Sequence, residues 1–184
     1  AILPRDYVFV VDISGSMQGS IGAGYQMRRV GRTYEPVTKV QRYEVAALFG
    51  AALAKKCGKV DVCLFADQPI LHPVPAGSSV LRYIESVQQN IGVVGYGTNI
   101  HGSIARAYDG HDRVVLFSDE ASHDCDRQMP ANIPVVHTFN LAGYKAGTIP
   151  SGPGRFTYGG FTDNSLTLMQ LVELGQNADW PWMT

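Results

Sequence analysis

The stretch Tyr7–Met17, YVFVVDISGSM, decides how the rest of the chain is interpreted. Its first part is a near-continuous apolar run, which predicts a buried central strand of a parallel sheet over residues 6–11. An Asp-x-Ser-x-Ser triplet follows directly and brings Asp12, Ser14 and Ser16 onto the turn at the end of that strand. One carboxylate and two hydroxyls aimed at one spot are the oxygen ligands that a hard divalent cation prefers. A serine-rich turn without a metal is the alternative interpretation of this triplet alone.

Two later segments add oxygen ligands and weaken that alternative. Thr98 and Asn99 follow a glycine-rich stretch, GVVGYGTN, and Asp119 follows another apolar run, RVVLFSDE. The three segments, in this order, resemble the metal-ion-dependent adhesion site of von Willebrand factor A domains. The resemblance implies a site for Mg2+, or for Mn2+ or Ca2+, lined by five residues: Asp12, Ser14, Ser16, Thr98 and Asp119.

The same resemblance implies how such a site works. The three hydroxyl groups usually bind the cation directly, and the two aspartates often act partly through water. Because few charged groups touch the cation, it stays electrophilic and recruits a Glu or Asp carboxylate from a protein partner. The chain has no Gly-x-Ser-x-Gly elbow, phosphate loop or zinc helix motif. We therefore expect a metal-dependent protein-binding module and not an enzyme.

Apolar runs alternate with helix-type patterns along the chain. The expected helices cover residues 39–56, 78–89, 99–108 and 165–175, and the expected strands cover residues 6–11, 60–65, 69–74, 113–117, 134–139 and 155–158. This alternation predicts an α/β fold with a doubly wound, mostly parallel sheet flanked by helices on both faces. In such sheets ligands bind outside the carboxyl ends of the strands, where Asp12 and Asp119 are expected. We interpret residues 1–184 as one Rossmann-like von Willebrand A domain.

The composition is that of an ordinary soluble domain. The 184 residues are 45% hydrophobic and 17% charged, with a net charge of -1, which fits one domain with a sizeable core. Such a charge gives no drive toward nucleic acid or an anionic membrane, and no apolar run approaches the roughly 20 residues of a membrane helix. Three cysteines, with no pair at metal-ligand spacing, argue against a disulfide framework and favour a reducing compartment. The expected location is cytoplasmic.

Further segments narrow the resemblance to Ro-like proteins, in which a von Willebrand A domain accompanies a TROVE module. The segments that carry it are LFADQPILHPVP, VGYGTNIHGSIARAY and FTYGGFTDNSLTLMQLV. The resemblance implies a component of a bacterial Ro-like RNA–protein particle, in which a separate helical-repeat ring binds RNA. No such repeat occurs in these 184 residues. Contact with RNA is therefore expected only through a parent protein.

One segment departs from the family pattern. About 20 residues, at positions 18–38, separate the Asp-x-Ser-x-Ser turn from the first expected helix, where a connection of about 2–6 residues is usual. We interpret them as an inserted, flexible basic loop that could act as a recognition lid for an acidic partner or an RNA phosphate. The alternative is a tolerated surface insertion. The residues predicted to contact a partner are Arg28, Arg29, Arg32, Asn99 and Glu120.

Other interpretations stay open at this point. His101 could face the site, although a histidine in such a place is more often a satisfied helix residue. Glu120 could hold a water-bridged ligand or point to solvent. Two other functions compete: a von Willebrand module of an AAA+-linked cofactor-insertion or chaperone system, and a metal-dependent phosphohydrolase. The second would also need a placed general base and a second metal or an arginine clamp.

Overall fold

A six-stranded sheet forms the centre of the domain, in the order β5-β4-β1-β6-β7-β8. The computed structural model describes residues 7–20, 27–31, 33–36, 40–55, 60–120, 122, 128–142, 148–150, 152–160, 162 and 164–176. The strands of this sheet are β1 (Tyr7–Asp12), β4 (Val60–Phe65), β5 (Pro69–Leu71), β6 (Arg113–Ser118), β7 (Val135–Asn140) and β8 (Arg155–Gly159). Neighbouring strands are parallel except for the antiparallel pair β4–β5 at one edge. The predicted doubly wound, mostly parallel sheet is confirmed.

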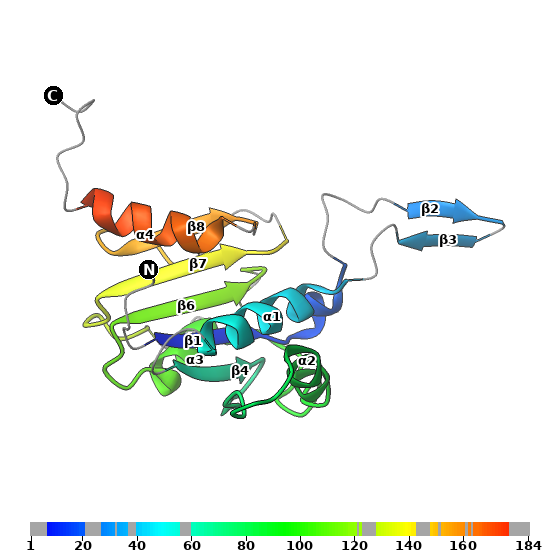
Figure 1. Ribbon diagram of the computed structural model, residues 1–184, viewed down its shortest axis with the longest axis horizontal. Coiled ribbons are helices and arrows are strands. Elements are labelled where there is room, and N and C mark those ends of the chain that lie inside the picture. The colour runs from blue at the N-terminus through cyan, green and yellow to red at the C-terminus, as the bar shows by residue number, and fades with distance from the viewer. Residues whose placement is uncertain are drawn as a thin grey trace, which may run out of the picture.

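Helices cover both faces of this sheet. They are α1 (Arg42–Ala54), α2 (Val80–Gln88), α3 (Ile100–Ala107) and α4 (Ser165–Gln176), with a short 3-10 turn, η1 (Gly15–Gln18). α1, α2 and α4 pack on one face and α3 on the other (Figure 1). None of the helices within the described ranges is long and apolar enough to cross a membrane.

Strand β1 shows why the central strands are continuous apolar runs. Phe9 and Val11 belong to the apolar cluster beneath α1, α2 and α4. Val8 and Val10 point the other way, into the cluster beneath α3. Successive side chains of a strand alternate between faces, so a strand covered on both sides must be apolar at every position.

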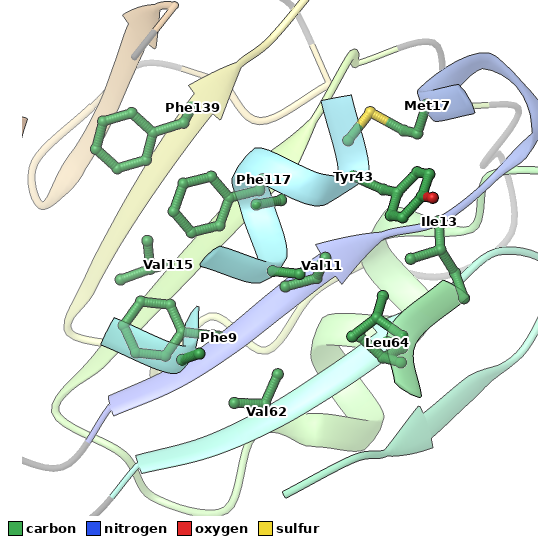
Figure 2. Close-up of a cluster of buried hydrophobic side chains, with 14 of the residues drawn as sticks. Phe9, Val11, Ile13, Met17, Tyr43, Val62, Leu64, Val115, Phe117 and Phe139 are labelled. Atoms are coloured by element: carbon green, nitrogen blue, oxygen red, sulfur yellow. The ribbon is translucent and has the colours of Figure 1, made fainter. Parts of the chain in front are cut away.

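Aromatic rings from three adjacent strands run through the first cluster. The ring centroids of Phe9 and Phe117 lie 6.3 Å apart, and those of Phe117 and Phe139 lie 5.2 Å apart. Figure 2 shows these rings following one another across β1, β6 and β7, with Met17 and Tyr43 at the end of the cluster nearest η1. The turn that carries the Asp-x-Ser-x-Ser triplet is thus anchored in the core through the buried side chain of Met17.

Most predicted element ends agree with the structure to within two residues, and two elements differ by three residues at one end. α1 begins at Arg42 and not at residue 39, because Gln41 and Glu44 form a capping box in which the Gln41 N–H donates to Glu44 Oε2 at 2.7 Å. Val40, which lies within the predicted helix, therefore precedes the observed one and is exposed, and Leu48 is exposed as well. Strand β5 ends at Leu71 and not at residue 74, since the prolines that follow cannot donate to a ladder.

The segment at residues 18–38 differs from the expected loop. It contains an antiparallel hairpin of β2 (Met27–Val30) and β3 (Thr33–Pro36), with Gly31 at a φ of 64° in the turn. Figure 1 shows this hairpin away from the main sheet. A two-stranded ribbon of this kind needs no continuous apolar run, so the hydrophobic pattern gave no signal for it. Arg28 and Arg29 lie in β2, and Arg32 lies outside the described residues.

Candidate metal centre

Asp12 ends strand β1 and is fully buried. Its Oδ1 accepts a hydrogen bond from the Ser14 N–H at 2.9 Å, and its Oδ2 accepts one from the Ser118 hydroxyl at 2.6 Å. Ser118 ends the neighbouring parallel strand β6. Two donors, one from each strand end, therefore fix the orientation of this carboxylate at the carboxyl edge of the sheet.

The two serines of the triplet lie on the turn that leads into η1. Ser14 is buried and Ser16 is exposed, and their Oγ atoms are 3.2 Å apart. The turn is held at its base by the Ile13 N–H, which donates to the Phe65 carbonyl at 2.9 Å. The structure thus brings the Asp12, Ser14 and Ser16 side chains together, with Ser16 open to solvent.

Thr98 reaches the same edge on a loop between α2 and α3. Its loop is tied to the serine turn by the Gly15 N–H, which donates to the Tyr96 carbonyl at 3.2 Å. A second tie comes from Ser122, which follows β6 and whose hydroxyl donates to the Thr98 carbonyl at 3.1 Å. The three segments singled out in the sequence are therefore joined by hydrogen bonds.

Asp67 positions this loop, and the sequence analysis missed it. Its carboxylate Oδ2 accepts a hydrogen bond from the Tyr96 N–H at 3.0 Å. A Cβ at Gly95 or Gly97 would overlap the carboxylate oxygens, so the observed contact of Asp67 with this loop needs glycine on either side of Tyr96. The available signal was an Asp directly after the apolar strand in LFADQP, together with the alternating glycines of GYGT. Nothing in the sequence shows that these two segments meet.

Asp119 lies just beyond β6 and is fully buried. Arg42, the first residue of α1, places its Nη1 3.7 Å from Asp119 Oδ2 and donates from the same nitrogen to the Ser16 carbonyl at 2.9 Å. A guanidinium group therefore lies at the rim of the candidate site. The sequence analysis did not anticipate Arg42, because its contact with Asp119 is set by the packing of α1 on the sheet.

The electrostatics of the edge favour an added cation. Burial raises the pKa of Asp12 to about 6, the hydrogen bonds from Ser118 and Ser14 oppose this rise, and the charge of Asp119 adds to it. Two buried carboxylates thus share one region with hydroxyl and amide donors and the guanidinium of Arg42. The ionised form of Asp12 is therefore less favourable there than in water.

The donor types fit a hard divalent cation. The five predicted residues offer three hydroxyl and two carboxylate groups, a set that suits Mg2+, Mn2+ or Ca2+ better than softer transition metals. Within the part of the chain that the structure describes, no group of three or more His, Cys, Asp or Glu residues could hold a metal ion. A metal at this edge would therefore depend on the serine and threonine hydroxyls.

Glu120 and Asn99, both predicted to contact a partner, have structural roles at this edge. Glu120 is only 8% exposed, so the interpretation that its side chain points to solvent is wrong. Its φ of 58° is rare for a residue other than glycine, and its N–H donates to Ser118 Oγ at 3.0 Å. Asn99 caps α3, since its Oδ1 accepts from the Gly102 N–H at 3.0 Å. A direct contact of either residue with a partner stays a prediction.

His101 is engaged by the backbone. Its Nδ1 accepts a hydrogen bond from the Met129 N–H at 3.2 Å, which leaves the proton on Nε2, 3.0 Å from the Thr148 carbonyl. Both ring nitrogens thus have backbone partners, as expected for a satisfied histidine. These contacts do not support a metal-binding role for His101.

No family model and no curated protein sequence matches this chain. Solved structures do: the Ro (RSR) protein of Deinococcus radiodurans superposes with a TM-score of 0.63, at 16% identity over 94% of this chain and 34% of that protein. The fold is that of a von Willebrand factor A-like domain. The chain spans about a third of the length of the Ro protein that it matches.

Two further structures share this von Willebrand A-like architecture at lower similarity. An aerotolerance-related membrane protein of Bacteroides fragilis has a TM-score of 0.50, at 14% identity over 92% of this chain and 97% of that chain. Proximal thread matrix protein 1 from the mussel byssus has a TM-score of 0.51, at 16% identity over 92% of this chain and 45% of that chain. Identities this low show a common fold and nothing about what this chain binds.

Proposed function

We propose that this von Willebrand A-like domain is a metal-dependent protein-binding module. The observation that carries the proposal is the convergence of the buried Asp12 carboxylate with the Ser14 and Ser16 hydroxyls, 3.2 Å apart, at the carboxyl edge of the sheet. Thr98 and Asp119 would complete the ligand set for Mg2+ or Mn2+. When bound, the cation would supply an electrophilic position for a Glu or Asp carboxylate of a protein partner.

The chain's own residues would divide the work between neutral and charged groups. Ser14, Ser16 and Thr98 supply neutral oxygens, which leave most of the cation's charge uncompensated. Asp12 and Asp119 supply negative charge from a buried position, directly or through water. Because Ser16 is exposed, a partner would approach the cation from its side of the turn.

The side chains near the site favour binding over catalysis. A phosphohydrolase needs a general base within reach of a water molecule. His101, the candidate base nearest to Thr98 in the sequence, has both nitrogens engaged by backbone groups. Both Asp12 oxygens likewise accept hydrogen bonds that fix the carboxylate.

The biological setting that we favour is a Ro-like RNA–protein particle. The likeness to the Ro protein of Deinococcus radiodurans, at a TM-score of 0.63, supports this choice at the level of fold. In that setting RNA would contact the parent protein, and this domain would recruit an acidic protein partner. A role beside an AAA+ protein is the alternative, and it predicts metal-dependent binding as well.

Calorimetry tests the metal site directly. Mg2+ and Mn2+ are titrated into the EDTA-treated chain, its Asp12→Asn variant and an Asp109→Asn control. Asp109 is an exposed carboxylate between α3 and β6, at the opposite edge of the sheet. We expect one-site binding that is lost in Asp12→Asn and kept in Asp109→Asn. An absence of heat in the unmodified chain, with a melting temperature unchanged by either cation, would contradict the proposal.

A further inference from the structure

Tyr96 is a highly exposed aromatic residue at the rim of the candidate metal site. Its side chain is 65% exposed, and that of Val93, in the same loop, is 71% exposed. The backbone of Tyr96 is nevertheless fixed on both sides, because its N–H donates to Asp67 and its carbonyl accepts from the Gly15 N–H. Tyr96 is thus exposed to solvent on a segment whose backbone is fixed. The residues that contribute most to binding at protein interfaces are often held in this way.

Two glycines form a seat for the Tyr96 ring. A Cβ at Gly92 would lie 2.6 Å from the Tyr96 hydroxyl oxygen, and a Cβ at Gly15 would lie 4.0 Å from Tyr96 Cδ1. The ring therefore extends from the position of Gly15 to that of Gly92. Gly15 lies between Ser14 and Ser16, so one edge of the ring adjoins the proposed metal ligands.

The loop that carries this ring has no charged side chain of its own, and the exposed Asp67 carboxylate lies beside it. The segment Ile91–Asn99 contains no Asp, Glu, Lys, Arg or His. The nearby Asp67 carboxylate accepts a hydrogen bond from the loop backbone. An acidic partner side chain placed here would be repelled by Asp67, whereas an apolar one would gain about 25 cal/mol for each Å² removed from water.

We propose that Tyr96 and Val93 select the protein partner. They would favour a carboxylate ligand with an apolar side chain two positions away in an extended segment. Successive residues of an extended chain advance about 3.3–3.6 Å, and residues two apart lie on the same face. A partner segment whose acidic side chain reaches the cation would then place the apolar side chain over the Tyr96 ring. This inference rests on the proposed metal-dependent binding.

Two synthetic peptides test the selection. Ac-Gly-Gly-Glu-Gly-Gly-NH2 and Ac-Leu-Gly-Glu-Gly-Leu-NH2 are titrated into the Mg2+-saturated 15N-labelled chain and followed by amide chemical shifts. The same titrations use Tyr96→Ala, Tyr96→Phe, and Leu174→Ala as a matched control, because Leu174 on α4 is also 65% exposed. Calorimetry gives the Mg2+ affinity of each variant.

We expect the leucine peptide to bind about fivefold tighter than the glycine peptide. Tyr96→Ala should remove this preference, Tyr96→Phe and Leu174→Ala should keep it, and the Mg2+ affinity should be the same throughout. Equal affinities for the two peptides, or no binding of either, would contradict partner selection by Tyr96 and Val93. Neither result would contradict the proposed metal site. A lower Mg2+ affinity in Tyr96→Ala would show that Tyr96 positions Thr98 and does not select partners. If the unmodified chain binds no Mg2+, the proposed function falls and this inference with it.

Discussion

Two carboxylates, the half-buried Glu173 and the buried Asp12, hold negative charge in this domain in opposite ways. At Glu173, on α4, Arg113 Nε donates to Oε1 at 2.6 Å, a second guanidinium nitrogen pairs with Oε2, and His137 Nε2 lies 2.9 Å from Oε1. Burial alone would raise the pKa of Glu173, but the hydrogen bonds from Arg113 and His137 lower it to about 2. At Asp12, burial dominates and raises the pKa to about 6.

Glu173 and Asp12 differ in the source of the positive charge that balances each carboxylate. The Glu173 cluster brings its own cation from the first residue of β6, so it is complete and joins α4 to the sheet. Among the described residues, the Asp12 carboxylate accepts hydrogen bonds from neutral hydroxyl and amide donors, and the guanidinium of Arg42 pairs with Asp119 instead. Charge that is balanced internally serves stability, and charge that is left unbalanced at an edge is suited to an ion from solution.

The largest effect is expected where the charge is balanced. Glu173→Ala leaves Arg113, a buried guanidinium, without its partner, and should lower the free energy of unfolding by about 3 kcal/mol. Urea unfolding followed by circular dichroism measures this loss. The double variant Arg113→Met with Glu173→Leu should recover part of it, since it removes both charges. A midpoint in Glu173→Ala equal to that of the unmodified chain would show that the ion pair contributes nothing to stability.

The pH dependence of stability should separate the two carboxylates. Without metal, Asp12 has a pKa of about 6 in the folded state against 3.8 as its ordinary value, so the folded state binds more protons between about pH 4 and 6. The free energy of unfolding should therefore fall by about 3 kcal/mol as the pH rises through this window. Glu173 acts in the opposite sense and at lower pH: its contribution is complete above about pH 4.5 and is lost as the pH falls toward 2.

Unfolding curves at intervals from pH 4 to 7 test this, with EDTA and with Mg2+. The decline should appear in the EDTA series, be absent from Asp12→Asn, and shrink with saturating Mg2+, because a bound cation favours the ionised carboxylate. If the free energy of unfolding of the unmodified chain in EDTA does not fall over this pH range, the pKa of Asp12 is not raised in the folded state.

The smallest effect is expected at Arg42, and its sign is the informative part. Arg42→Gln removes a positive charge 3.7 Å from Asp119 Oδ2. If that charge opposes a cation at the edge, Mg2+ should bind about threefold tighter in the variant, as expected for a partly screened interaction. Calorimetry beside an Arg82→Gln control, an exposed arginine on α2, measures the change. Weaker binding in Arg42→Gln would mean that the guanidinium organises the site through the Ser16 carbonyl.

The predictable part of this molecule is the part in which burial dictates residue type. β1 and β6 are covered on both faces, so their apolar runs identified the sheet and located Asp12 and Asp119 at its edge. The groups that adjust the site were not predictable, because each pairing joins distant segments. Asp67 meets the Tyr96 loop, Arg42 meets Asp119, and neither contact leaves a local pattern. The hairpin of β2 and β3 is a local element, but it was not predicted because a two-stranded ribbon needs no apolar run.

The contact between Asp67 and the loop at Gly95–Gly97 also separates two kinds of position. At some positions the side chain can be varied, and at others a side chain would disturb the loop. A side chain at Gly95 or Gly97 would displace the Asp67 carboxylate, because that carboxylate fills the space that a Cβ would need. Tyr96 and Val93 hold their places through backbone groups, and their side chains face solvent. A combinatorial library confined to positions 93 and 96 would therefore change the chemistry presented beside the proposed cation site while the loop that carries Thr98 keeps its shape.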